Sequence, residues 1–128
     1  MTREEKDLLL KDLIARLPYG GVKIKYCGND EILRDSNFGD LFMKYCSGVL
    51  DTSPGIEEVK PYLFPLSSMT EEQKIIYGDL FYATVTTDPS YALDHINELI
   101  DWLNANHFDY RGLIEKGLAI DATGLNIY

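Results

Sequence analysis

Residues 88–106 limit the fold of this chain more than any other stretch of the sequence. Asp88 and Pro89 form a typical helix start, because an aspartate side chain accepts hydrogen bonds from free backbone amides and proline suits the first helical position. Apolar residues then recur at helical spacing, and they are Ala92, Leu93, Ile96, Leu99, Ile100 and Leu103. The pattern predicts an amphipathic helix over 89–106 that must pack one face against another element.

A second amphipathic helix is predicted over residues 2–17. Thr2 and Glu5 have the spacing of a capping box, and Pro18 ends the helix. The apolar face comprises Leu9, Leu10, Leu13, Ile14 and Leu17, and three polar residues lie outside it, Lys11, Asp12 and Arg16. We expect the two helices to share one core, formed by Leu9, Leu13, Leu17, Ile96, Ile100 and Leu103.

The segment that follows the first helix has the pattern of a small sheet. Residues 22–27 alternate apolar and polar side chains, as a strand with one wet face does. Further strands are predicted at 32–33, 41–46 and 56–63, and Pro61 puts the last of them at a sheet edge or at its own end. We expect a curled, largely antiparallel sheet.

The C-terminal half is predicted to be mainly helical. A capping-box pattern at 68–71 predicts a helix over 69–80, and periodicity leaves open whether 81–87 is helix or strand. Asp109 is expected to cap a short helix over 110–116, and the tail 119–128 is expected to be loosely ordered. The chain is therefore assigned to the α+β class, as a single domain of residues 1–128 with an N-terminal helix, a small antiparallel sheet and two or three C-terminal helices.

Composition and the lack of a signal or membrane-spanning pattern predict a cytoplasmic protein. Its 128 residues, 45% of them hydrophobic, suffice to form one core. The opening residues contain charges and no apolar signal segment, and no apolar run approaches the roughly 18 residues of a membrane span. Cys27 and Cys46 are expected to be reduced thiols, so no disulfide is predicted.

The net charge of −9 limits the partners of this chain. The first 60 residues carry 9 basic and 11 acidic side chains, whereas residues 61–128 carry 3 and 10. The acidic second half repels phosphate backbones, so direct nucleic-acid binding is disfavoured. The charge fits either simple solubility or another protein with a basic surface.

No pattern of catalytic, cofactor-binding or metal-ligating residues is recognisable. His95 and His107 are twelve residues apart, and the sequence contains no His-x-x-x-His and no Cys-x-x-Cys motif. The sequence holds no Gly-x-Ser-x-Gly nucleophile motif and no glycine-rich phosphate loop between a strand and a helix. We therefore predict no catalytic residue, no cofactor and no metal.

Aromatic residues supply the one candidate site. Nine tyrosines are more than a small core requires, and tyrosine, tryptophan and arginine dominate the binding energy of protein interfaces. Trp102, Tyr110 and Arg111 are the candidate interaction residues. The alternative is structural: Phe108 and Tyr110 cover the end of the 89–106 helix, and Arg111 pairs with Glu115.

Three stretches resemble a family of small uncharacterised proteins from gut Bacteroidales and their phages or mobile elements. They are EEKDLLLKDLIARLPYG at 4–20, VKPYLFPLSSMTEEQ at 59–73 and DWLNANHFDYRGLIEKGLA at 101–119. The pair Gly20-Gly21 departs from the single glycine expected in that family. The resemblance implies a bacterial cytoplasmic protein but no activity and no site residue.

These observations favour a non-enzymatic protein-interaction or regulatory module. The alternative is a small enzyme or ligand-binding domain with a pocket between the sheet and the helices. A concave pocket with converging polar groups would favour the second, and an exposed apolar patch with an acidic rim would favour the first.

Overall fold

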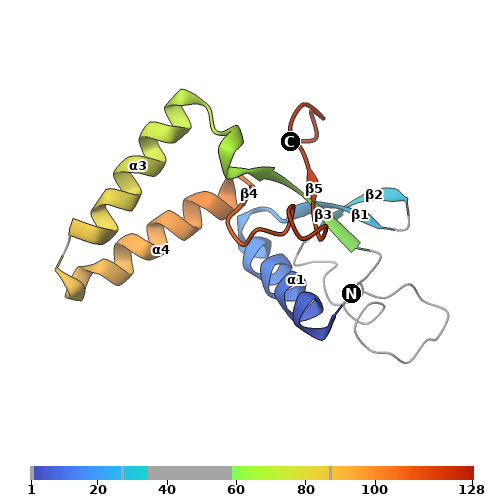
Figure 1. Cartoon of the computed structure of the whole chain (residues 1–128), viewed down its shortest axis with the longest axis horizontal. Coiled ribbons are helices and arrows are strands. Elements are labelled where there is room, and N and C mark those ends of the chain that lie inside the picture. Colours follow the sequence, from blue (N-terminus) through green and yellow to red (C-terminus); the bar gives the residue numbers. More distant parts are fainter. Residues whose placement is uncertain (1, 27, 35–58, 87) are drawn as a thin grey trace.

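The computed structural model describes residues 2–26, 28–34, 59–86 and 88–128, and its fold is α+β (Figure 1). Within these residues, an N-terminal helix is followed by three strands, two long helices and two short strands that complete a small mixed sheet. The predicted fold class and order of elements are confirmed. The predicted strand at 41–46 lies outside the described residues.

Helix α1 (Arg3–Arg16) begins and ends as its sequence indicates. The Thr2 side chain accepts a hydrogen bond from the Glu5 amide at 3.1 Å, and the Glu5 side chain accepts one from the Thr2 amide at 3.3 Å. A 3₁₀ turn at Leu17–Tyr19 follows. Gly21 then has a φ of 86°, and a Cβ there would lie 2.1 Å from the Leu33 carbonyl oxygen, so this turn requires glycine.

Strand β1 (Val22–Tyr26) pairs antiparallel with both β2 (Asn29–Leu33) and β3 (Val59–Pro65). β3 as a whole is not an edge strand, because it pairs with β1 on one side and with β5 on the other, but Pro61 lies before the residues that pair with β5. Successive residues of a strand direct their peptide groups to opposite sides, and the Leu63 carbonyl accepts from Ala122 on the β5 side at 2.8 Å. The missing N–H of Pro61 faces that same side, where pairing begins only at Tyr62.

Two short strands from the C-terminal quarter make the sheet mixed rather than antiparallel. Both β4 (Phe108–Asp109) and β5 (Ile120–Asp121) run parallel to β3. Within the tail 119–128, Ala119 and Ala122 are buried. β3 is therefore the strand with which β1, β4 and β5 all pair.

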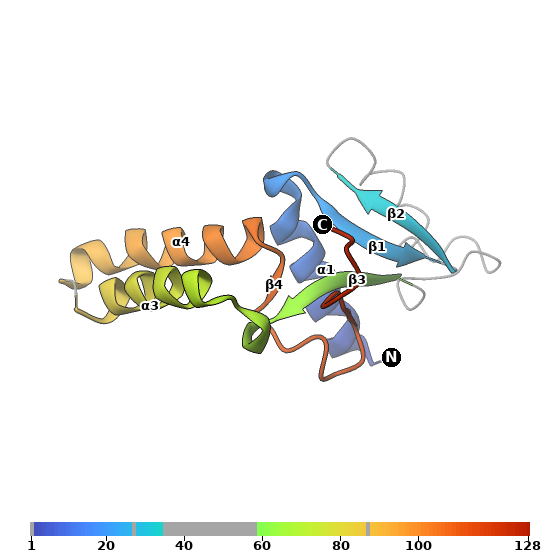
Figure 2. The same ribbon diagram turned by 90° about the horizontal axis from the view of Figure 1, so that it is seen from above.

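Helices α3 (Glu71–Thr86) and α4 (Pro89–Ala105) form an antiparallel hairpin that projects from one end of the sheet (Figures 1 and 2). Residues 81–86 continue the helix, which answers the question that periodicity left open. The helix begins two residues later than predicted, because Thr70 and Gln73 form the capping box, with hydrogen bonds of 2.9 and 3.2 Å. The Asp88 cap is confirmed by its bond from the Ser90 amide at 3.1 Å.

The short helix predicted over 110–116 is wrong. Residues 113–117 form turns instead, and the Asp109 carboxylate accepts hydrogen bonds from the amides of Leu113 and Ile114, both at 2.9 Å. Asp109 therefore caps a turn as it would cap a helix, but the chain does not continue into helical turns.

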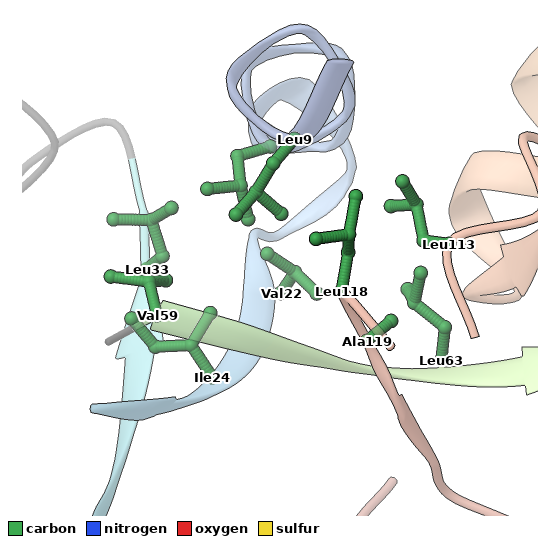
Figure 3. Packing of buried hydrophobic residues seen from close by; sticks show 10 residues of the cluster. Leu9, Val22, Ile24, Leu33, Val59, Leu63, Leu113, Leu118 and Ala119 are labelled. Carbon is green, nitrogen blue, oxygen red and sulfur yellow. The ribbon is translucent and has the colours of Figure 1, made fainter. Parts of the chain in front are cut away.

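The core consists of two clusters instead of one. The first lies between α1 and the sheet (Figure 3) and contains Leu9, Leu13, Val22, Ile24, Leu33, Val59, Leu63, Leu113, Leu118 and Ala119. The second lies at the base of the hairpin and contains Met69, Leu99, Leu103 and Phe108. The predicted burial of Ile96 is wrong, because this residue is 41% exposed. Ile100 and Leu17 are only partly buried.

Truncating Leu13 to alanine should lower the free energy of unfolding by about 2–5 kcal/mol, because the residue is buried against the sheet. Ile96→Ala removes the same kind of side chain from an exposed position and should cost under about 1 kcal/mol. Urea unfolding of both variants measures the difference. Equal losses would mean that the two helices share one core after all.

Candidate interaction surface

The three predicted interaction residues lie at the base of the hairpin. Trp102 is half-buried on α4, and its ring stacks on Phe108 of β4 with centroids 5.5 Å apart. The Tyr110 hydroxyl donates to the Asn104 side chain at 2.8 Å. Arg111 donates from Nη1 to the Tyr110 hydroxyl at 2.8 Å, and its guanidinium lies 4.5 Å from the centroid of that ring. These contacts favour the structural interpretation, and a partner contact at the three residues stays a prediction.

Arg111 belongs to a buried charge cluster that the sequence reasoning missed. Its Nη1 donates to the Asp12 carboxylate at 2.8 Å, so its acidic partner is Asp12 of α1 and not Glu115. Asp12 also accepts from Arg16 Nε at 2.8 Å and from Arg16 Nη2 at 3.0 Å. The same Nη2 donates to the Phe108 carbonyl at 2.8 Å. Asp12 and Arg16 are fully buried, although both were placed outside the apolar face of α1.

A wholly different surface is left open on the hairpin. Among the described residues of α3 none is buried, and residues 80–87 carry no charge. Large apolar side chains are nevertheless exposed there: Ile75 at 66%, Tyr82 at 68% and Val85 at 65%. Exposed apolar side chains gathered in this number on one helix mark a contact surface. We call the exposed apolar side chains of the two helices the hairpin patch, and its largest members are Ile75, Phe81, Tyr82, Val85, Tyr91 and Leu93.

The charged residues of the two hairpin helices are mostly acidic. Residues 71–105 contain seven acidic side chains and one lysine, and that lysine pairs with Glu71 at 3.2 Å. Asp79, Asp88 and Asp94 are exposed, and each lies within three residues of a patch member in the sequence. The combination of an apolar centre and an acidic rim is complementary to an apolar surface with basic margins.

A cavity of about 350 Å³ lies where the hairpin joins the sheet. Its walls include Phe64, Ser68, Gln73, Asn106, His107 and Tyr128. A pocket between sheet and helices is therefore present, as the ligand-binding alternative requires. Among the described residues, its lining includes no carboxylate, lysine, arginine or cysteine, but Ser68 and His107 are both on its wall.

One wall of this cavity is Tyr128, whose hydroxyl lies between two strands. It accepts a hydrogen bond from the Lys23 amide at 2.9 Å and donates one to the Tyr62 carbonyl at 2.9 Å. The β1–β3 register places Lys23 opposite Tyr62, so the hydroxyl takes the position of a direct ladder bond. The ring stacks on His107 with centroids 3.6 Å apart.

His107 lies in an unusual environment at the α4–β4 junction. Its φ is 61°, and Nδ1 is buried without a hydrogen-bond partner among the residues that the structure describes. Burial, with the charges of Arg16 and Lys23 adding to it, lowers the pKa of His107 to about 4. The ring is therefore neutral at pH 7.

No group of three or more side chains that could hold a metal ion occurs among the described residues. Comparison with protein families, curated proteins and solved structures finds no match to this chain.

Stability should rise as the pH is raised from about 4 to about 6.5. Within that window the unfolded chain binds a proton at His107 that the folded chain does not bind, so folding is favoured as protons are removed. His107→Asn should flatten this dependence, because asparagine tolerates a positive φ and does not titrate. Urea midpoints measured between pH 4.5 and 7.5 test this. Equal pH slopes for the two proteins would assign the dependence to other groups.

Proposed function

We propose that this chain is a non-enzymatic protein-interaction module whose hairpin patch binds another protein. The observation that carries the proposal is the exposure of Ile75, Tyr82 and Val85, each about two-thirds exposed on a helix with no buried residue. Exposed apolar side chains in this number mark sites of association. Aromatic members such as Tyr82 are the kind of residue that supplies most binding energy at interfaces.

The partner we propose is a protein that presents apolar side chains within a basic margin. The acidic residues of 71–105 would attract such a margin and speed the encounter. A second copy of this chain would instead bring two acidic rims together. A membrane surface is a weaker candidate, since most biological surfaces are anionic and would repel the rim. No described helix is long and apolar enough to cross a membrane.

The ligand-binding alternative rests on the cavity at the hairpin base. Its aromatic, hydroxyl and amide walls can hold a small uncharged molecule, and its described lining includes no carboxylate, lysine or arginine. We rank this function second, because the cavity occupies one junction whereas the hairpin patch extends over two helices.

Tyr82→Asp should abolish partner binding and leave the fold intact. The side chain is 68% exposed, so the substitution puts a charge in the contact and removes nothing from the core. Affinity purification of tagged protein from cells that naturally make it identifies the partner, and binding is then measured with purified components. The affinity should fall as salt is added, because the rim contributes through exposed charges.

Leu125→Asp is the matched control, because Leu125 is also exposed, at 50%, but lies outside the hairpin. It should bind like the unmodified chain.

Tyr110→Ala combined with Arg111→Ala tests the three residues at the base of the hairpin. This double variant should have a lower melting temperature and no selective loss of binding, because it removes the hydrogen bonds to Asn104 and Asp12. Normal binding by Tyr82→Asp would disprove the proposal. A dimer in sedimentation velocity that Tyr82→Asp dissociates would identify a second copy as the partner.

A further inference from the structure

The outer face of α3 has the geometry of a helix-packing seam. Ile75, Gly78, Tyr82 and Val85 are spaced by three, four and three residues, which is the spacing of alternating a and d positions in a heptad. At about 100° per residue these four positions fall within a sector of roughly 80°. All four are exposed.

A second seam with the same spacing lies on the opposite side of α3. Gln73, Tyr77, Leu80 and Thr84 are its half-buried positions. Tyr77 and Leu80 pack against the core cluster at the hairpin base, so this inner seam is the one that α4 covers. One helix therefore carries two seams, and α4 occupies only the inner one.

Gly78 is the residue that needs a special explanation. It lies in the middle of an exposed helix, where glycine lowers stability relative to alanine. Nothing lies within 4 Å of where its Cβ would be, and its φ is not left-handed, so neither crowding nor backbone conformation requires glycine in this chain. A glycine within an exposed seam lets a second helix backbone approach closely.

We infer that the partner contributes an α-helix, with basic residues flanking its apolar stripe, that packs along the outer seam of α3 and crosses it closely at Gly78. This inference rests on the proposed function and specifies the partner element. The seam from Ile75 to Val85 is about 15 Å long at 1.5 Å per residue, so about three turns of partner helix cover it. Helix-in-groove recognition uses apolar contacts at this spacing.

The test uses a defined probe, a 14-residue peptide with leucines at heptad positions, one alanine at its centre and lysines elsewhere. A peptide of the same composition in scrambled order keeps the charge and loses the stripe. Fluorescence anisotropy with the full chain should show at least tenfold tighter binding of the heptad peptide. Equal binding of the two peptides would overturn the inference, because charge alone would then account for association.

Gly78→Ala and Gly78→Leu separate this inference from the proposed function. Both should raise the melting temperature of the chain, because they remove a glycine from a helix interior without any clash. Both should weaken binding of the heptad peptide, Gly78→Ala by about tenfold and Gly78→Leu by more, because the added side chain keeps the backbones apart.

Unchanged peptide binding by Gly78→Leu, together with loss of the natural partner by Tyr82→Asp, would overturn the close helix crossing and leave the proposed function standing. Unchanged binding of the natural partner by Tyr82→Asp would overturn both.

Discussion

The buried cluster of Asp12, Arg16 and Arg111 is the interaction on which the arrangement of the whole molecule depends. The Asp12 carboxylate on α1 accepts hydrogen bonds from two guanidinium groups. Arg16 also donates a hydrogen bond to the carbonyl of Phe108. The cluster thereby fixes α1 to the segment that leaves the hairpin and enters the sheet. Removing one member of a buried ion pair typically costs about 3–5 kcal/mol, because the remaining charge stays buried.

With its base fixed in this way, the hairpin does not need to pack its outer half against anything. Leu99, Leu103, Met69 and Phe108 form the second core cluster at the base, and the stretch of α4 before Leu99 has no fully buried residue. Folding free energy is therefore concentrated in the body, while the projecting helices keep apolar side chains in water. Residues on the hairpin surface can therefore change to suit a partner without loss of the fold.

Local signals in the sequence predicted what is locally determined. The starts of α1 and α4 were predictable because a cap involves residues only two or three apart, as Thr2 with Glu5 and Asp88 with Ser90 show. The burial of Arg16 was not, because its Phe108 contact spans 92 residues. Helical periodicity alone placed Arg16 in solvent.

The candidate site failed to emerge from the sequence for a related reason. Trp102, Tyr110 and Arg111 have the composition of an interface, but composition does not tell whether a ring is covered, and here other parts of the chain pack on all three. The spacing of Ile75, Gly78, Tyr82 and Val85 was readable in advance. That these four residues are exposed could not be predicted, because it depends on α4 packing against the opposite side of α3.

Site-specific photo-cross-linking tests the central claim most directly. A benzophenone amino acid placed at position 82, and separately at position 125, reports which protein touches each exposed site inside cells that naturally make this chain. The account predicts that position 82 yields an adduct with one protein, that the linked residue lies on a helix of that protein with basic flanks, and that position 125 yields no such adduct. Adducts from position 82 to this chain alone, or equal adducts from both positions, would contradict it.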